Sequence, residues 1–206
     1  MEAYCIYGAS GHSKVIIEIL EASGYAVKEL YDDDQNKIKL LDFNVSNRKE
    51  ILQQPDLNWI IGIGDNKIRK KVAETNQLSY SRAIDPGAKI SKRTQIGKGT
   101  VIMPGVTINS SVIIGDHVIL NTNSSVDHDC ALDDYVHLSP NATLCGCVKV
   151  GEGTHIGAGA IVIPGIAIGK WVKIGAGCIV IKDIPDHATV VGNPGKIIKI
   201  TKENER

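Results

Sequence analysis

The sequence has few aromatic residues and no excess of either charge. Phe, Trp and Tyr make up 4% of the 206 residues, so a hydrophobic core must be built from smaller side chains. Lys plus Arg number 23, as do Asp plus Glu, and the formal net charge is therefore zero. Without a net positive charge there is no overall attraction to nucleic acid or to an anionic membrane. We expect neither class of partner.

Long apolar runs and paired cysteine motifs are also missing. No segment reaches the length of a bilayer span, and the first ten residues lack the basic and apolar regions of a secretory signal. The five cysteines include no CxxC pair, so the sequence indicates neither a disulfide framework nor a zinc site. These features predict a cytoplasmic protein with reduced thiols, no membrane insertion and no bound metal.

The main feature present is an aliphatic residue that recurs at every sixth position from Ile84 to Val180. This period fits neither an α-helix nor one long strand, but it is typical of a parallel β-helix with one short strand and one turn per repeat. Three such sides close a coil of about 18 residues. A small or branched residue follows four positions after each aliphatic one. Cys130 and Cys178 occupy such positions, which predicts that both are buried in the core.

Residues 1–82 lack this period and predict a separate α/β domain. A short apolar strand over residues 4–7 leads into the turn GASGHS at 8–13, and a helical pattern follows that stops at Gly24. Further strands are expected over residues 25–31 and 59–63, the latter leading into a basic helix. This order predicts a small parallel, Rossmann-like sheet. We therefore predict a mixed fold with domains at 1–82 and 83–206.

The glycine-containing turn at residues 8–13 has the features of a phosphate site. Small residues at a helix start let backbone N–H groups approach a phosphate. The acidic end of the next strand, Asp32-Asp33-Asp34, is then placed to bind a ribose or base. GASGHS does not match GxGxxG, however, so a turn with a purely structural role is the alternative.

The segment SSVDHDC, residues 124–130, sets three polar residues inside the repeat. Val126 occupies the inward position, so His128 should point outward. A neighbouring carboxylate, Asp127 or Asp129, would fix the imidazole tautomer and leave the other ring nitrogen as a base. One coil later Gly146 leaves space beside the imidazole, and its backbone N–H is a candidate oxyanion donor. The alternative is a solvated surface histidine.

The remaining histidines allow a second interpretation. His137 and His155 are one coil apart and should stack on the same side of the β-helix. With His117 as a third ligand they would suggest a zinc site, but His117 is offset from their column. His187 follows the end of the repeat and is expected to be solvated.

Outward aliphatic residues such as Ile113 and Ile119 need a partner surface.

Four features together resemble one family. The GASGH turn, the six-residue repeat, the segment VDHDCALDDYVHLSPNA and the closing segment VVGNPGKIIK resemble the hexapeptide-repeat sugar acetyltransferases of the bacillosamine-pathway N-acetyltransferase and sialic-acid O-acetyltransferase type. The resemblance covers the whole chain. It implies a left-handed β-helix and a homotrimer with acetyl-CoA bound between neighbouring β-helices. The N-terminal domain would hold a nucleotide-linked amino sugar.

The resemblance also assigns residues to roles. The catalytic residues would be His128 as general base, Asp129 as its partner and Gly146. The residues near the nucleotide sugar would be Gly8, Ser10, Gly11, His12, Asp32, Asp33, Gly64 and Asn66. The residues near acetyl-CoA would be Asn121, His137, Gly146, His155, Ala158, Lys170, Ala176, Pro194 and Lys196. Lys173 and Lys199 are further candidates for its phosphates, and a solvated basic tail is the alternative. Relatives usually carry glutamate after the catalytic histidine, and Asp129 is one methylene shorter, so Asp127 is the alternative partner.

These assignments imply a direct acetyl transfer from acetyl-CoA to the 4-amino group of a nucleotide-linked amino-deoxy sugar. His128 would take the proton of the amine, and Cys145 and Cys147 would be bystanders. Two alternatives remain open. One is O-acetylation of sialic acid or a related sugar, and the other is a non-catalytic trimeric scaffold that binds a nucleotide sugar.

Overall fold

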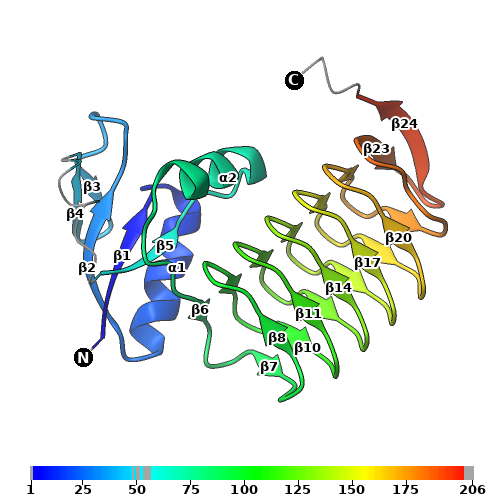
Figure 1. The fold of residues 1–206 in the computed structure, drawn as a ribbon, viewed down its shortest axis with the longest axis horizontal. Helices are drawn as coiled ribbons and strands as arrows, with labels where there is room; N and C mark the ends of the chain where they lie inside the picture. The colour runs from blue at the N-terminus through cyan, green and yellow to red at the C-terminus, as the bar shows by residue number, and fades with distance from the viewer. Residues whose placement is uncertain (1, 48, 50–51, 53–56, 202–206) are drawn as a thin grey trace.

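The computed structural model describes residues 2–47, 49, 52 and 57–201. An α/β region at the N-terminus lies beside a long β-helix, and residues 196–200 lie at the far end of that β-helix (Figure 1). The predicted architecture is confirmed. The hairpin described next has no counterpart in the predictions.

The N-terminal region is built around a five-stranded sheet with the strand order β3-β4-β2-β1-β5. The predicted strands are β1 (Ala3–Tyr7), β2 (Ala26–Tyr31) and β5 (Asn58–Ile61), and all are parallel. The hairpin of β3 (Lys39–Leu40) and β4 (Phe43–Ser46) extends this sheet through a parallel pairing of β4 with β2. Its strands have two and four residues, too short to give a clear periodic pattern.

Two helices complete this region. Helix α1 (Gly11–Ala22) buries Ile16, Ile19 and Leu20 on one side and is followed by Gly24 at φ +77°. That backbone conformation favours glycine and ends the helix as the sequence predicted. Helix α2 (Asn66–Thr75) begins after Asp65, whose side chain accepts a hydrogen bond from Ile68 N–H and caps the helix.

The β-helix has three sides, each a parallel sheet whose strands are one coil apart. The first side contains β6 (Ala83–Ile84), β9 (Val101–Ile102), β12 (Ile119–Leu120), β15 (His137–Leu138), β18 (His155–Ile156), β21 (Lys173–Ile174), β23 (Ala188–Val191) and the antiparallel β24 (Lys196–Ile200). The second side contains β7 (Lys89–Ile90), β10 (Thr107–Ile108), β13 (Ser125–Val126), β16 (Thr143–Leu144), β19 (Ile161–Val162) and β22 (Ile179–Val180). The third side contains β8 (Gln95–Ile96), β11 (Ile113–Ile114), β14 (Ala131–Leu132), β17 (Lys149–Val150) and β20 (Ala167–Ile168).

The core of the β-helix consists of the repeating aliphatic residues and the small residues that follow them. From Ile102 onward the aliphatic series is buried, and Cys130 and Cys178 are buried with it, as predicted. Each strand contributes one inward side chain, and its equivalents stack above and below. Burial of this continuous column stabilises a domain almost free of aromatic residues.

The first side of the β-helix packs against the N-terminal region. Ile119 is 1% exposed because it belongs to a cluster with Ile16, Leu20 and Ala83. The expectation that Ile119 needs a partner surface from another chain is therefore wrong, because the same chain covers it. Ile113, on the third side, is 52% exposed, so it is still expected to need a partner surface.

Buried polar contacts reinforce this packing. Arg69 of α2 is 1% exposed and donates hydrogen bonds to the carbonyl oxygens of His117 (2.9 Å) and Tyr135 (2.9 Å) on the β-helix. It also donates to the Ile63 and Gly64 carbonyls and to Asn66 Oδ1, while Asn66 Nδ2 donates to the Gly153 carbonyl. The loop of residues 63–65 is thereby fixed against the β-helix. No helix among the described residues is long and apolar enough to cross a membrane.

Candidate functional site

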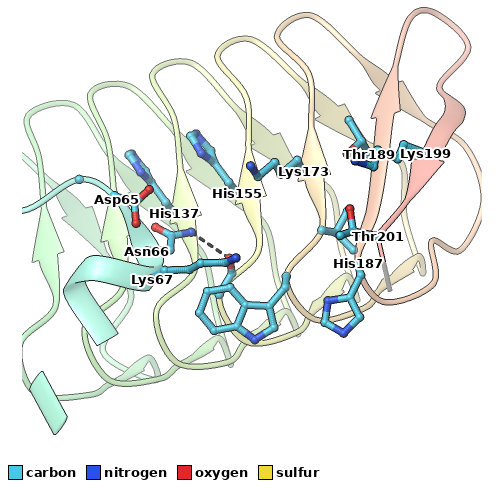
Figure 2. Close-up of a pocket in the computed structure, with 14 residues that line it drawn as sticks. Asp65, Asn66, Lys67, His137, His155, Lys173, His187, Thr189, Lys199 and Thr201 are labelled. Carbon is cyan, nitrogen blue, oxygen red and sulfur yellow. Dashed lines mark hydrogen bonds between the residues drawn. The ribbon is translucent and has the colours of Figure 1, made fainter. Parts of the chain in front are cut away.

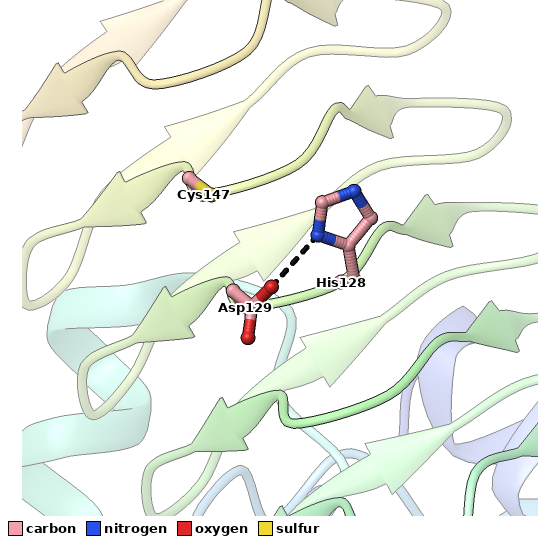
Figure 3. Close-up of side chains that lie close together, drawn as sticks. All are labelled: His128, Asp129 and Cys147. Carbon is pink, nitrogen blue, oxygen red and sulfur yellow. Dashed lines mark hydrogen bonds and ion pairs between the residues drawn. The ribbon is translucent and has the colours of Figure 1, made fainter.

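The first group of candidate residues lies at the corner between the second and third sides of the β-helix. The chain leaves β13, makes the corner at residues 127–130 and enters β14. His128 and Asp129 project outward there, with side chains 56% and 58% exposed, and His128 Nδ1 lies 2.8 Å from Asp129 Oδ2 (Figure 3). The outward orientation predicted for His128 is confirmed.

The structure distinguishes the two aspartates that flank His128. Asp127 Oδ1 accepts hydrogen bonds from Asn109 Nδ2 (2.7 Å) and from the backbone N–H of His128 (2.8 Å), and Asp127 Oδ2 lies 4.0 Å from His128 Nε2. Asp127 therefore holds the corner, whereas Asp129 contacts the imidazole. The shorter side chain of Asp129 still reaches the ring.

Gly146 lies directly beside the imidazole, as its position one coil later predicts. A Cβ at residue 146 would lie 2.7 Å from His128 Cε1, which is too close for two carbon atoms. Its backbone N–H donates to no backbone carbonyl of the described residues. The corner therefore combines a ring nitrogen, a carboxylate and the backbone N–H of the buried Gly146 within a small space.

The two carboxylates alter the electrostatics of this corner. The hydrogen bond to Asp129 and the charge of Asp127 raise the pKa of His128 above its ordinary value. A raised pKa makes the neutral ring a stronger proton acceptor. With Nδ1–H donated to Asp129, the lone pair of Nε2 is the available acceptor.

One further side chain completes the corner. Cys147, the exposed member of the five cysteines, has its sulfur within 4.8 Å of ligating atoms of His128 and Asp129. Sequence reasoning assigned it no role. The column spacing alone could have found it, because Cys147 is one coil after Asp129.

The second group lies in a cleft of about 630 Å³ between the loop before α2 and the first side of the β-helix (Figure 2). Gly64 and Asn66, predicted near the nucleotide sugar, line this cleft together with His137 and His155. Residues that sequence reasoning missed also line it, namely Asp65, Lys67, Gly153, Trp171, Val172, Thr189 and Thr201. Lys173 and Lys199, which the sequence suggests as candidates for the CoA phosphates, line it as well.

The two histidines of the cleft stack as predicted. Their ring centroids are 4.7 Å apart, and the planes of the two rings are nearly parallel. His137 Nε2 lies 3.2 Å from Asn121 Nδ2, and His155 Nε2 lies 2.7 Å from Ser139 Oγ. Burial, with the nearby charges of His155 and Arg69, lowers the pKa of His137 to about 3. His137 is thus neutral at physiological pH, which suits a hydrogen-bonding role and not a role as a base.

The glycine-containing turn meets the acidic end of β2. Gly8 has φ +105°, and Ala9 N–H donates to Asp32 Oδ2 (2.7 Å), which also accepts from Lys37 Nζ (2.8 Å). Ser10 precedes α1 without a side-chain cap, since its hydroxyl donates to the Gly62 carbonyl. Gly11 is exposed at the helix start. The predicted residues of this turn are therefore brought together with Asp32.

Asp33 and His12 occupy opposite environments in this part of the molecule. Asp33 is exposed but held by the hydroxyl groups of Tyr7 (2.6 Å) and Tyr31 (3.1 Å). His12 is half-buried, and burial with the charge of Arg69 lowers its pKa to about 4. His12 is also close enough to His137 to affect the pKa of that histidine. The turn and the cleft are therefore neighbours.

Other predicted residues lie outside the cleft. Ala158 and Ala176 are exposed at the corner after the first side, and Lys170, Pro194 and Lys196 are exposed near the C-terminal end. His187, for which the sequence predicts a solvated position, is half-buried and lines the cleft. Strand β23 begins after His187 and extends the first side.

The histidine metal site considered from the sequence does not form. His117 is 2% exposed and lies between the rings of Tyr80 and Tyr135, with centroids 4.6 and 5.4 Å away. His137 and His155 have Asn121 and Ser139 as partners. Among the described residues, the group of ligating side chains close enough to hold an ion is His128, Asp129 and Cys147.

The two groups lie on different parts of the triangular coil. His128 is at the corner where the second and third sides meet, whereas His137 is on the first side, which lies opposite that corner. A ligand bound in the cleft of one chain therefore faces away from the imidazole of His128 in the same chain.

Comparisons with known proteins agree with this architecture. The family described as PglD N-terminal domain matches residues 4–76. A search of curated proteins gives no match. The chain is similar to a crystal structure of a histidine-to-asparagine variant of perosamine N-acetyltransferase from Caulobacter crescentus in complex with CoA and GDP-perosamine. The identity is 36%, the TM-score is 0.90, and the match covers 97% of each chain.

Two other solved structures are similar over the same length. The acetyltransferase domain of PglB from Neisseria gonorrhoeae is 33% identical, with a TM-score of 0.89 and coverage of 96% of this chain and 100% of that domain. WeeI from Acinetobacter baumannii is 26% identical, with a TM-score of 0.84 and coverage of 96% and 100%.

Proposed function

Since the chain belongs to the family of hexapeptide-repeat sugar acetyltransferases, we propose that it transfers the acetyl group of acetyl-CoA to the 4-amino group of a nucleotide-linked amino-deoxy sugar. The perosamine N-acetyltransferase that it resembles was crystallised with CoA and GDP-perosamine. This similarity, over 97% of the chain, supports a nucleotide-linked amino sugar as acceptor and favours N- over O-acetylation.

The observation that carries the catalytic part is the pairing of His128 with Asp129 beside Gly146. Asp129 accepts the Nδ1–H of the imidazole, so Nε2 is free to take a proton. As the amine attacks the thioester carbonyl, a bond forms from nitrogen to carbon and the proton of the amine passes to Nε2. The carbon–sulfur bond then breaks and CoA leaves as a thiolate.

Gly146 would assist the same step. The thioester oxygen gains negative charge during the attack, and a backbone N–H directed at it lowers the barrier. The absence of a side chain at residue 146 lets the imidazole of His128 lie directly against this backbone, so the base and the N–H are close together. Replacing one oxyanion donor typically costs an enzyme about 10²–10³ in kcat.

The nucleotide end of the acceptor would bind at the turn before α1. The exposed start of α1 offers N–H groups and a partial positive charge to a phosphate. Asp33, oriented by two tyrosine hydroxyl groups, is placed to accept hydrogen bonds from the nucleoside. Gly8, Ser10, Gly11, His12 and Asp32 form this turn and its support.

Acetyl-CoA would bind between two copies of the chain. Asn121, His137 and His155 would meet its thioester end, and the amino groups of Lys173 and Lys199 would approach its phosphates. Because the cleft and the His128 corner lie on different parts of the coil, a second copy is needed to bring them together. Exposed Ile113 and Ile161 flank that corner and supply an apolar contact surface. A homotrimer would supply the second copy that brings the cleft and the corner together. We propose that it acts in the cytoplasm.

The test is release of CoA from acetyl-CoA, measured with a thiol reagent across UDP-, GDP- and dTDP-linked amino sugars, CMP-sialic acid and free sialic acid. We expect turnover with one 4-amino sugar and a loss of about 10²–10⁴-fold in His128→Ala. The matched control is His187→Ala, which removes an imidazole of the cleft that has no proton-transfer role in this proposal.

The other outcomes are informative. Turnover with sialic acid alone would change the assignment to O-acetylation. Tight binding of a nucleotide sugar without turnover across the panel would show that the protein is a non-catalytic binding scaffold. Full activity in His128→Ala would remove the general base from the mechanism while leaving the reaction in place.

A further inference from the structure

We propose that His128, Asp129 and Cys147 form a Zn²⁺ site, and that a bound ion switches the enzyme off. The site itself depends only on the geometry of the corner. Its inhibitory role rests on the proposed function of His128 as the base. The ion would be a regulator and has no part in the acetyl transfer.

The repeat itself builds this site. Asp129 and Cys147 are one coil apart and occupy equivalent corner positions, with φ values of +59° and +62°. Equal backbone geometry projects the two side chains in the same direction, one above the other (Figure 3). Because Gly146 of the next coil has no side chain, the imidazole of His128 lies directly against that coil and close to Cys147.

The distances suit a small tetrahedral ion. The ligating atoms of the three side chains all lie within 4.8 Å of one another, and His128 Nδ1 is 2.8 Å from Asp129 Oδ2. Zinc bonds of about 2.0–2.3 Å in a tetrahedron separate ligand atoms by roughly 3.3–3.7 Å. All three side chains are exposed, so small rotations reach this geometry without disturbing the core.

The chemistry of the ligands selects the metal. A thiolate, an imidazole and a carboxylate are the ligand types of Zn²⁺, whereas Mg²⁺ and Ca²⁺ require oxygen ligands. One thiolate and one carboxylate together balance the charge of the ion. Binding releases the thiol proton of Cys147, and a water molecule completes the tetrahedron.

A bound ion removes the base whichever ring nitrogen it uses. Coordination through Nε2 occupies the lone pair that would take the amine proton. Coordination through Nδ1 displaces that proton to Nε2, which then has no lone pair to offer. It also separates Asp129 from the imidazole. Cys147, which takes no part in the acetyl transfer, would thus make the enzyme sensitive to thiol-binding metals.

The binding test uses Co²⁺, whose thiolate complexes absorb in the near ultraviolet, with the tag-free full-length protein and no substrates. We expect one Co²⁺ per chain with a thiolate charge-transfer band that Zn²⁺ abolishes. Cys147→Ser and His128→Ala should each lose the band. Cys145→Ser is the matched control and should keep it, because Cys145 is half-buried and outside the cluster.

The inhibition test follows loss of the thioester absorbance under buffered free Zn²⁺. Cys147→Ser should need at least about tenfold more Zn²⁺ for half-inhibition, while its activity in a chelator equals that of the wild type. A band that persists in Cys147→Ser, or no band in the wild type, would overturn the site. Binding without inhibition would overturn the regulatory role. If no substrate is acetylated, the proposed function fails, yet the cobalt titration still decides on the site.

Discussion

His128 and His137 are close in the sequence but opposite in environment. His128 stands at an exposed corner where carboxylates raise its pKa, whereas burial lowers the pKa of His137 to about 3. The same side chain therefore gains proton affinity in one place and loses it in the other. The proton affinity of each histidine follows from its burial and its neighbours, both of which vary from one side of the coil to the next.

The largest expected effect tests whether the two regions meet only in an assembly. Ile113→Glu places a charge on the exposed third side, so subunits should separate, and activity should fall by more than about 100-fold because cleft and corner no longer meet. Light scattering measures the mass. Gln95→Glu, one coil earlier on the same side, is the control. A fully active monomer would show that one chain suffices.

The next variant disrupts the buried region alone. Arg69→Met leaves the carbonyl oxygens of His117 and Tyr135 without their donor, at a cost of about 3 kcal/mol. The midpoint of thermal unfolding should fall by roughly 6–12 °C. Calorimetry measures it, with the exposed Arg82→Met as control. An unchanged midpoint would mean that Arg69 contributes nothing to the packing of α2 on the β-helix.

A single methyl group should disrupt the exposed corner. In Gly146→Ala the new Cβ pushes the imidazole of His128 aside, since the ring is free to move into solvent. We expect roughly a 100-fold loss of kcat, because a displacement of about 1 Å is costly in catalysis. The unfolding midpoint should stay the same. Equal losses of stability and activity would instead point to damage to the coil.

The smallest expected effect tests why the pKa of His128 is raised while that of His137 is lowered. Asp129→Asn removes the interaction that contributes most to the raised pKa of His128, so that pKa should fall. A protonated ring cannot act as the base, and the acid limb of the kcat profile should therefore move to lower pH. The plateau should drop by roughly tenfold because the tautomer is less well fixed.

The profile is measured with a chelator present, and Asp133→Asn, at the next corner, is the control. If the acid limb of the kcat profile does not move in Asp129→Asn, that limb reports the titration of a group other than His128. A limb that moves equally in Asp133→Asn would indicate a general change in surface charge.

Much of the fold was predictable because the repeat is a local property. A residue at every sixth position fixes which side chains point inward, so the burial of Cys130 and the stacking of His137 on His155 followed from counting. The same counting placed Gly146 beside His128. The β3–β4 hairpin was missed because its short strands lack a pattern.

What the sequence determined by itself was the β-helix, the order of its columns and the composition of the His128 corner. Only the tertiary structure decided that α1 covers Ile119, that Asp129 and not Asp127 contacts the imidazole, and that Trp171 and His187 face the cleft. The physical reason is the range of the interactions. Stacking between coils repeats at a fixed spacing, whereas the docking of the N-terminal region and the choice among side-chain rotamers depend on contacts that no spacing records.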